Sequence, residues 1–234
     1  MSEYIYGKNV VREAINQKRN IEKIFFTDDK NPLIDDCKKN SIEFQIIPKD
    51  KMNKMVSGMH QGVIAAVEEY KYFPLEEIIS NKKDALICVL DGLEDPHNLG
   101  AILRTCEAAK VDGIILPKNR SVRLNSTVAK VSTGAIELVK CVEVTNLTRT
   151  LKDLKEKGYW IVGAEIGNTS KIMWDQKYDM PIALIIGSEG KGISRLVKEE
   201  CDFLVQIPMS GVINSLNASI SAAILIYEIR RQQR

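Results

Sequence analysis

The chain is poor in the residues that build metal sites and disulfide frameworks. Its 234 residues include only two histidines, His60 and His97, so a histidine-rich metal site is excluded. The five cysteines are odd in number, scattered, and without a C-x-x-C pair (Cys37, Cys88, Cys106, Cys141 and Cys201). Such a set favours reduced thiols over disulfides or a zinc ribbon. We therefore expect a cytoplasmic protein with no bound metal.

Long apolar runs are also missing. No stretch approaches the roughly 20 apolar residues that a membrane helix needs. Residues 1–8 lack the basic and then apolar pattern of a secretory signal. We expect no membrane association. The hydrophobic content of 44% and charged content of 27% are ordinary for a globular protein, and 234 residues can bury a sizeable core.

A strong charge of one sign is absent overall but present locally. The net charge of +2 is too small to indicate a nucleic-acid partner. Residues 113–136, however, contain no acidic side chain and four basic ones, which are Lys118, Arg120, Arg123 and Lys130. A run of this kind is usually a solvated face, and the alternative is a contact to a phosphate backbone.

Residues 1–70 predict a small α/β unit. Its strands are expected at 21–27, 42–47 and 63–67, and its helices are expected to start at Asn9, at Asn31-Pro32 and at Pro48. His60-Gln61-Gly62 is interpreted either as a turn in which Gly62 supplies a positive φ or as a polar contact to a substrate. Residues 71–84 contain Pro74 and a cluster of charges, which predicts a linker with one helical turn.

Strands and helices alternate in residues 85–234. The strands are expected at 85–90, 113–116, 138–142, 159–164, 182–186 and 204–207, and the helices at 98–109, 125–132, 147–157, after 186 and at 218–229. Continuous apolar strands that alternate with helices predict an α/β fold with a mostly parallel sheet covered on both faces. Ligands of such sheets bind beyond the carboxyl ends of the strands, so a site is expected in the loops after Leu90, Ile186 and Ile207.

The first of these loops, Asp91 to Thr105, opens a helix that carries one conspicuous arginine. Asn98 follows Asp95-Pro96 at the place where a helix N-cap is expected, and capping is its ordinary interpretation. Arg104 lies six residues further on, in a helix of otherwise apolar and small residues. It is either a surface arginine or a guanidinium directed at a phosphate or carboxylate.

The second loop, Leu184 to Ser194, has three glycines in the spacing G-x-x-G-x-G. A Walker loop needs Ser or Thr after Gly-Lys, but Gly190-Lys191 is followed by Gly192, and the dinucleotide fingerprint has a different spacing. Both phosphate-binding mechanisms are therefore excluded. What remains is a loop whose backbone approaches a ligand closely and which presents Glu189.

The third stretch, Val205 to Arg230, begins as a strand, breaks at Pro208 and crosses a polar loop into a helix of small residues. The entrance of that helix is crowded with small polar residues, which are Asn214, Ser215, Asn217, Ser219 and Ser221. We hypothesise that this loop and helix close a pocket for an adenosyl cofactor. One face of the helix is expected to pack on the sheet and another to form a dimer seam.

In order and placement, these three loops resemble the three motifs of the SpoU (TrmH-like) branch of the SPOUT methyltransferases. The motifs stand here as Asn98–Arg104, Ile185–Gly192 and Ile207–Ser219. Through Tyr6–Ala14 and His60–Gly62, the N-terminal unit resembles the L30e-like substrate domain of rRNA ribose methyltransferases. The resemblance is closest to the RlmB-like branch, which acts on a guanosine of 23S rRNA.

The resemblance implies a fold, a cofactor and an acceptor. It implies an L30e-like RNA-binding domain at 1–70, a linker at 71–84 and a trefoil-knotted methyltransferase domain at 85–234; such knots are rare exceptions among folds. It implies a homodimer, a ribose 2′-hydroxyl of RNA as acceptor and S-adenosylmethionine as methyl donor. The cofactor would be bound around Gly187, Ile207, Met209, Leu216 and Asn217.

The resemblance also assigns roles to polar residues. Arg104 corresponds to the key catalytic residue, and we interpret it as binding a phosphate and polarising the hydroxyl, because a guanidinium holds its proton too firmly to be a base. The residues that hold Arg104, the loops and the ribose would be Asn98, Glu189, Ser215 and Asn217. The RNA-backbone contacts would be Lys118, Arg120 and Arg123.

Two alternatives stay open. The first is a relative that methylates guanosine in tRNA, or one that confers antibiotic resistance through rRNA. The N-terminal unit favours rRNA, because tRNA-directed relatives often lack such a domain. The second is a non-catalytic RNA-binding protein of the same fold. A protein without activity has no reason to keep Asn98, Arg104, Glu189 and Asn217 together, which argues against the second alternative.

Overall fold

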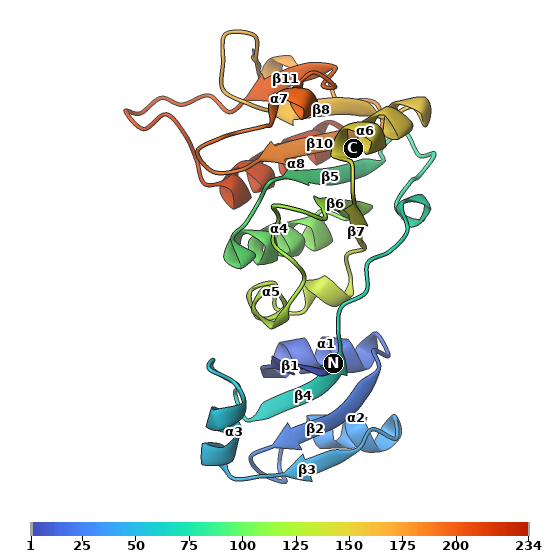
Figure 1. Cartoon of the computed structure of the whole chain (residues 1–234), viewed down its shortest axis with the longest axis vertical. Helices are drawn as coiled ribbons and strands as arrows, with labels where there is room; N and C mark the ends of the chain where they lie inside the picture. The colour runs from blue at the N-terminus through green and yellow to red at the C-terminus, as the bar shows by residue number, and fades with distance from the viewer. Residues whose placement is uncertain (1, 234) are drawn as a thin grey trace. The chain divides into compact units, whose positions relative to one another are not determined.

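The computed structural model describes residues 2–233, and the chain divides into two compact units. The first unit contains the residues up to Lys71 together with Arg123–Leu138, and the second contains Tyr72–Val122 and the chain from Val139 onward. This division by contacts differs from the predicted domain limits, 1–70 and 85–234, which remain a prediction. The two units are coloured by residue number in Figure 1.

The N-terminal unit is built on a four-stranded mixed sheet in the order β1-β4-β2-β3. Its strands are β1 (Ser2–Tyr6), β2 (Ile21–Phe26), β3 (Phe44–Ile46) and β4 (Val63–Glu68). β4 is antiparallel to β1 and β2, whereas β3 is parallel to β2. The helices are α1 (Lys8–Asn16), α2 (Leu33–Lys39) and α3 (Lys49–Met55). α1 buries one apolar stripe, Val10, Val11, Ala14 and Ile15, as its spacing predicts.

Two predictions for this unit are wrong. Asn9 does not cap α1, because the helix begins one residue earlier, after Gly7, whose φ of 100° suits glycine. Strand β1 was not predicted. It alternates only over Tyr4, Ile5 and Tyr6, and its place in the sheet comes from pairing with β4 rather than from its own pattern.

Residues 123–138 belong to the N-terminal unit by their contacts. They form α5 (Ser126–Val131), capped by the side chain of Asn125, and the 3-10 turn η2 (Ala135–Glu137). The Glu137 carboxylate forms a 2.6 Å ion pair with Arg19, and both side chains are largely buried. The Arg19 guanidinium also lies 3.7 Å from the centre of the Tyr70 ring. The ion pair therefore joins this segment to Arg19, in the loop between α1 and β2, and the ring contact joins Arg19 to Tyr70, just after β4.

The C-terminal unit contains a seven-stranded sheet in the order β7-β6-β5-β10-β8-β11-β9, and every neighbouring pair is parallel. The strands are β5 (Leu86–Asp91), β6 (Gly113–Pro117), β7 (Cys141–Val144), β8 (Trp160–Ala164), β9 (Lys171–Ile172), β10 (Ile182–Gly187) and β11 (Phe203–Gln206). Consecutive residues of β5 and β10 are buried, so both faces of the sheet are covered. The predicted α/β fold with a mostly parallel sheet is confirmed.

The helices of this unit are α4 (Pro96–Ala108), α6 (Leu147–Glu156), α7 (Arg195–Lys198) and α8 (Ala218–Gln233). α4 packs against α8, and α6 packs against α7. The predicted linker contains one 3-10 turn, η1 (Leu75–Glu77), as expected, and a second turn, η3 (Met173–Asp175), follows β9. Ile78 is 1% exposed and belongs to the core under α6, so part of the predicted linker is packed structure.

Two predicted boundaries differ from the structure, and one short strand was missed. α4 begins at Pro96, and its N-cap is Asp95, whose carboxylate accepts a 2.9 Å hydrogen bond from the His97 N–H. The capping role expected for Asn98 is therefore wrong. Proline is favoured at the first helical position, so the helix starts at Pro96 and Asn98 lies inside its first turn. The strand expected at 138–142 is β7, which starts at Cys141, and the short strand β9 was not expected.

Candidate active site

A cavity of about 720 Å³ opens beyond the carboxyl ends of β8, β10 and β11. Ligand pockets commonly measure about 300–1,000 Å³. Its lining comes from segments 164–166, 186–192 and 205–207 and from the loop and helix at 209, 215–218, 221 and 225. The five residues predicted to bind a cofactor all line this cavity, and they are Gly187, Ile207, Met209, Leu216 and Asn217. Whether they bind one remains a prediction.

The glycine-rich loop after β10 forms a tight hairpin at one wall of the cavity. Ser188 and Gly192 exchange backbone hydrogen bonds of 3.1 and 3.0 Å, which close its base. A side chain at Gly187 would place its Cβ 2.3 Å from the carbonyl carbon of Gly192, so the two strands of the hairpin meet backbone to backbone. Gly190 and Gly192 have φ values of 81° and 64°, in the left-handed region that favours glycine. The spacing of the three glycines thus serves this turn.

Three polar side chains from distant parts of the chain meet beside the hairpin. The Glu189 carboxylate accepts hydrogen bonds from the Asn98 amide (2.9 Å) and from the Asn217 amide (2.7 Å). Asn217 also donates to the Asn98 side-chain oxygen at 2.9 Å. Asn98 is 5% exposed, so its amide needs these partners. The cluster joins α4, the hairpin and the start of α8, which brings together the three predicted loops.

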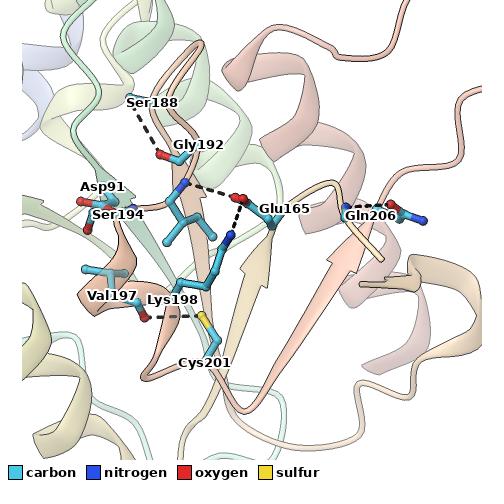
Figure 2. A network of polar contacts seen from close by, with 11 residues as sticks. Asp91, Glu165, Ser188, Gly192, Ser194, Val197, Lys198, Cys201 and Gln206 are labelled. Atoms are coloured by element: carbon cyan, nitrogen blue, oxygen red, sulfur yellow. Dashed lines mark hydrogen bonds and ion pairs between the residues drawn. The ribbon is translucent and has the colours of Figure 1, made fainter. Parts of the chain in front are cut away.

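Two further carboxylates hold the return strand of the hairpin (Figure 2). Asp91, at the end of β5, accepts a 2.7 Å hydrogen bond from the Ser194 N–H. Glu165, just after β8, accepts a 3.2 Å hydrogen bond from the Ile193 N–H and forms a 2.6 Å ion pair with Lys198. Glu165 also lines the cavity. It was not predicted, because only three strand ends were considered, although β8 ends at the same edge of the sheet.

The two remaining predicted catalytic residues, Ser215 and Arg104, differ in their position relative to the cavity. Ser215 lines the cavity and is exposed. Arg104 is exposed on α4 and is not among the residues that line the cavity. Within residues 2–233 its guanidinium makes no hydrogen bond or ion pair, so it is available to an external phosphate or carboxylate. Hydrogen bonds thus join Asn98 to Glu189 and Asn217. The latter two residues line the cavity, as Ser215 does, whereas Arg104 does not.

The basic run after β6 is divided between the two units. Lys118 and Arg120 are exposed in the C-terminal unit, and Arg123 is exposed in the N-terminal unit. The loop that carries Lys118 and Arg120 lies beside the turn after β5, because the Val122 N–H donates to the Leu93 carbonyl at 2.7 Å. Lys130 is engaged internally, since its ammonium donates to the Met59 carbonyl at 3.0 Å.

His60 belongs to a structural turn. Its Nδ1 accepts a 3.0 Å hydrogen bond from the Gly62 N–H, and its Nε2 lies 2.9 Å from the side-chain oxygen of Asn53. Gly62 has a φ of 80°, as the turn interpretation requires. Burial lowers the pKa of His60 below its usual value, and the charges of Lys49 and Lys130 lower it further. The imidazole thus serves the turn before β4, and its two ring nitrogens are occupied there.

Residues 2–233 contain neither a candidate metal site nor a candidate membrane-spanning helix. No three or more His, Cys, Asp or Glu side chains in this range are grouped so that they could hold a metal ion. Likewise, no helix in the described part of the chain has the length and apolar character needed to cross a membrane.

Two family profiles match successive parts of the chain. The profile of the SpoU rRNA methylase family matches residues 85–227. The profile described as the substrate-binding domain of RNA 2′-O ribose methyltransferases matches residues 4–73. A Staphylococcus haemolyticus protein assigned to the TrmH family of tRNA/rRNA methyltransferases is 46% identical over 238 residues, which cover 98% of this chain and 95% of the relative.

Solved structures share the fold of the chain at low sequence identity. The SpoU methyltransferase AviRb of Streptomyces viridochromogenes, solved in complex with AdoMet, has a TM-score of 0.86 at 22% identity and covers 99% of this chain and 90% of its own. An AdoMet-bound rRNA methyltransferase of Sinorhizobium meliloti has a TM-score of 0.85 at 23% identity, with coverages of 98% and 87%. These two likenesses concern the fold.

Proposed function

The chain belongs to the SpoU rRNA methylase family, and on that premise we propose that it transfers a methyl group from S-adenosylmethionine to a ribose 2′-hydroxyl of RNA. It is an RNA methyltransferase of the SpoU/TrmH type. The acceptor that we propose is a guanosine of 23S rRNA, as in the RlmB-like branch. The observation that carries the proposal is the hydrogen-bonded cluster of Asn98, Glu189 and Asn217, which joins the three separate motifs and contributes Glu189 and Asn217 to the cavity lining.

The cavity suits S-adenosylmethionine in size and lining. The hairpin is closed backbone to backbone at Gly187, so main-chain groups rather than side chains form that wall. Ile207, Met209 and Leu216 add apolar surface for an adenine ring. Both solved neighbours named above contain AdoMet, which supports the assignment of the cofactor. We propose that main chain around Gly187, Ile207 and Leu216 binds it.

In this proposal, residues of the chain hold and polarise the 2′-hydroxyl that accepts the methyl group. When bound, the cofactor supplies an electrophilic methyl group on a sulfonium. The attacking hydroxyl must be held in line with that group, so positioning is the main task of the protein. We propose that Arg104 binds an RNA phosphate and polarises the 2′-hydroxyl, while Ser215 and Asn217 contact the ribose. Glu189 keeps both amides of Asn98 and Asn217 in place.

RNA contacts are proposed for exposed basic side chains and for the N-terminal unit. Lys118 and Arg120 follow β6, whose carboxyl end lies at the same edge of the parallel sheet as the cavity. Together with Arg123 they are available to the phosphate backbone, which positions RNA without reading its sequence. We propose that the N-terminal unit is the L30e-like substrate domain. The match of its residues to a substrate-binding profile and the rRNA substrate named for a fold neighbour support this choice.

Two architectural features belong to the same proposal. The first is a trefoil knot in the domain at 85–234. The second is a homodimer. α8 buries Ala222, Leu225 and Ile229 inside the unit, whereas Ile220 and Tyr227 are about half exposed on another side of the helix. Ile224 lies between them at helical spacing and lines a second cavity with Tyr227. A second copy of the chain would cover this apolar stripe.

Calorimetry and methyl transfer by the Arg104→Ala variant test the proposal. The native protein should bind S-adenosylmethionine, and the variant should bind it with nearly the same affinity. Loss of a charge that stabilises the reacting oxygen should slow transfer to rRNA about 10²–10³-fold. Arg149→Ala is the matched control, because Arg149 is an exposed arginine paired with Asp153 on α6. If the native protein does not bind S-adenosylmethionine, the proposed enzymatic function is refuted. If the Arg104→Ala variant is fully active, the proposed role of Arg104 is refuted.

A further inference from the structure

The hairpin beside the cavity is held at its return strand by a partly buried ion pair. Glu165 directs one carboxylate oxygen at the Ile193 N–H. It directs the other at the Lys198 ammonium, as Figure 2 shows. The side chains of Glu165 and Lys198 are 18% and 39% exposed. Neither residue belongs to the three motifs, and neither has a role in the proposed methyl transfer.

The contact explains why the hairpin stays closed against the cavity. Ile193 is 4% exposed, so its N–H would lack a partner without the Glu165 carboxylate. Hydrogen bonds to an ionised acceptor are stronger than neutral ones, and Lys198 offsets the cost of burying the charge. A Cβ on Gly192 would lie 2.8 Å from the Glu165 carboxylate oxygen. Glycine at this position thus allows both the positive φ and the approach of the carboxylate.

The same residue also contacts β11, which contributes to the cavity lining. The Glu165 N–H donates to the Val205 carbonyl at 3.0 Å, and Val205 belongs to β11 and lines the cavity. Glu165 therefore connects the hairpin, α7 and the strand that leads into the loop at 207–217. Asp91 holds the next amide, that of Ser194, so the hairpin keeps one anchor when Glu165 is removed.

We propose that Glu165 is a positioning residue, with Lys198 as its partner, that holds the Gly187–Ile193 hairpin in the conformation that accepts S-adenosylmethionine. This inference rests on the proposed cofactor site. Its direct consequence is an ordered hairpin in the cofactor-free protein. Removal of the pair should therefore raise the dissociation constant and the KM for the cofactor. It should change kcat at saturating cofactor much less, because the bound cofactor restores the order of the wall.

Hydrogen exchange of the cofactor-free protein tests the positioning role without any ligand. Glu165→Ala should speed exchange of the Ile193 amide about tenfold or more. Glu165→Gln keeps an oxygen for that amide and should restore much of the protection, and Lys198→Met should fall between the two. Glu199→Gln is the control, because it removes the exposed Arg195–Glu199 pair, which does not line the cavity. Native protection in Glu165→Ala, or faster exchange spread evenly over the whole unit, would overturn the inference.

Calorimetry with S-adenosylmethionine then separates this inference from the proposed function. The inference predicts that Glu165→Ala weakens binding about tenfold while Glu199→Gln binds as the native protein does. Tight binding by Glu165→Ala alongside tight binding by the native protein would overturn the positioning role and leave the proposed function intact. If the native protein does not bind S-adenosylmethionine, the proposed cofactor assignment is refuted. The proposed role of Glu165 and Lys198 at a cofactor-binding wall is then refuted as well.

Discussion

At the scale of single residues, charge and burial decide what a side chain can do. Glu189 accepts two amide hydrogen bonds, and Glu165 accepts one backbone amide and one ammonium, so each carboxylate is committed to holding structure. Arg104 makes no hydrogen bond or ion pair within residues 2–233, so its guanidinium is free to bind a phosphate. His60 is the opposite case, because both of its ring nitrogens have partners in the protein.

His60 should make the stability of the protein depend on pH. Its pKa in the folded protein lies below the usual value of 6.5, so between these two values the unfolded chain binds the proton more readily. The contribution of neutral His60 to the stability of the folded protein is therefore fully present above pH 6.5. It is lost as the pH falls through the pKa that His60 has in the folded protein. Urea unfolding at several pH values between 5 and 8 measures this. His60→Asn, which keeps an acceptor for the Gly62 N–H, should flatten the profile.

A neighbouring residue that does not titrate supplies the control for that measurement. Met59→Gln changes a side chain that is 77% exposed and should leave the slope of stability against pH in this window as it is in the native protein. An unchanged slope in His60→Asn would show that His60 is not the titrating group.

At the scale of elements, the segments with strong repeating patterns could be predicted from the sequence, and the N-terminal strand and the short segments could not. β5, β8, β10 and α6 agree with expectation within one or two residues, because each has a strong repeating pattern. β1 and β9 are short and exist through pairing with neighbours. Helix starts were misplaced where Gly7 and Pro96 set the backbone before the expected asparagine cap.

The hairpin after β10 gives a prediction at this scale. Gly187→Ala would place a methyl group against the backbone of Gly192, which cannot move without opening the turn. We expect a loss of about 1–3 kcal/mol of stability, as for other overpacked sites, and at least tenfold weaker binding of S-adenosylmethionine. Thermal unfolding and calorimetry measure the two effects.

Gly167→Ala is the matched control for this variant. An added Cβ at Gly167 meets no atom within 4 Å, and its φ lies outside the left-handed region. It should therefore behave as the native protein does. Native affinity in Gly187→Ala would contradict a cavity wall formed by closely apposed backbone.

At the scale of the whole molecule, the site combines features that the sequence reveals with features that only folding creates. The cofactor-binding residues predicted from the motifs line one cavity, because the strands that precede them end at one edge of the sheet. The grouping of residues 123–138 with the N-terminal unit could not be predicted, since it has no spacing signal in the sequence. Glu165 follows β8, and the end of that strand at the same edge of the sheet is the signal that could have indicated it. The position of Arg104 outside the cavity likewise depends on how α4 packs.

The proposed homodimer predicts a change of molecular mass on mutation of α8. Tyr227→Glu places a charge on the half-exposed apolar stripe and should shift the protein toward a monomer, because the stripe would no longer exclude water. Light scattering after size-exclusion chromatography measures the mass. Leu196→Asp, at an equally exposed leucine on α7, should leave the mass unchanged. A native protein that runs as a monomer at micromolar concentration would contradict the homodimer.

We propose that this protein methylates a guanosine ribose in 23S rRNA. The most direct measurement maps 2′-O-methyl groups in 23S rRNA and tRNA from a strain that lacks the gene. We expect one 2′-O-methylguanosine of 23S rRNA to disappear, and we expect the native gene to restore it and the Arg104→Ala gene not to restore it. An unchanged 23S rRNA together with a tRNA guanosine that has lost its 2′-O-methyl group would contradict the proposal.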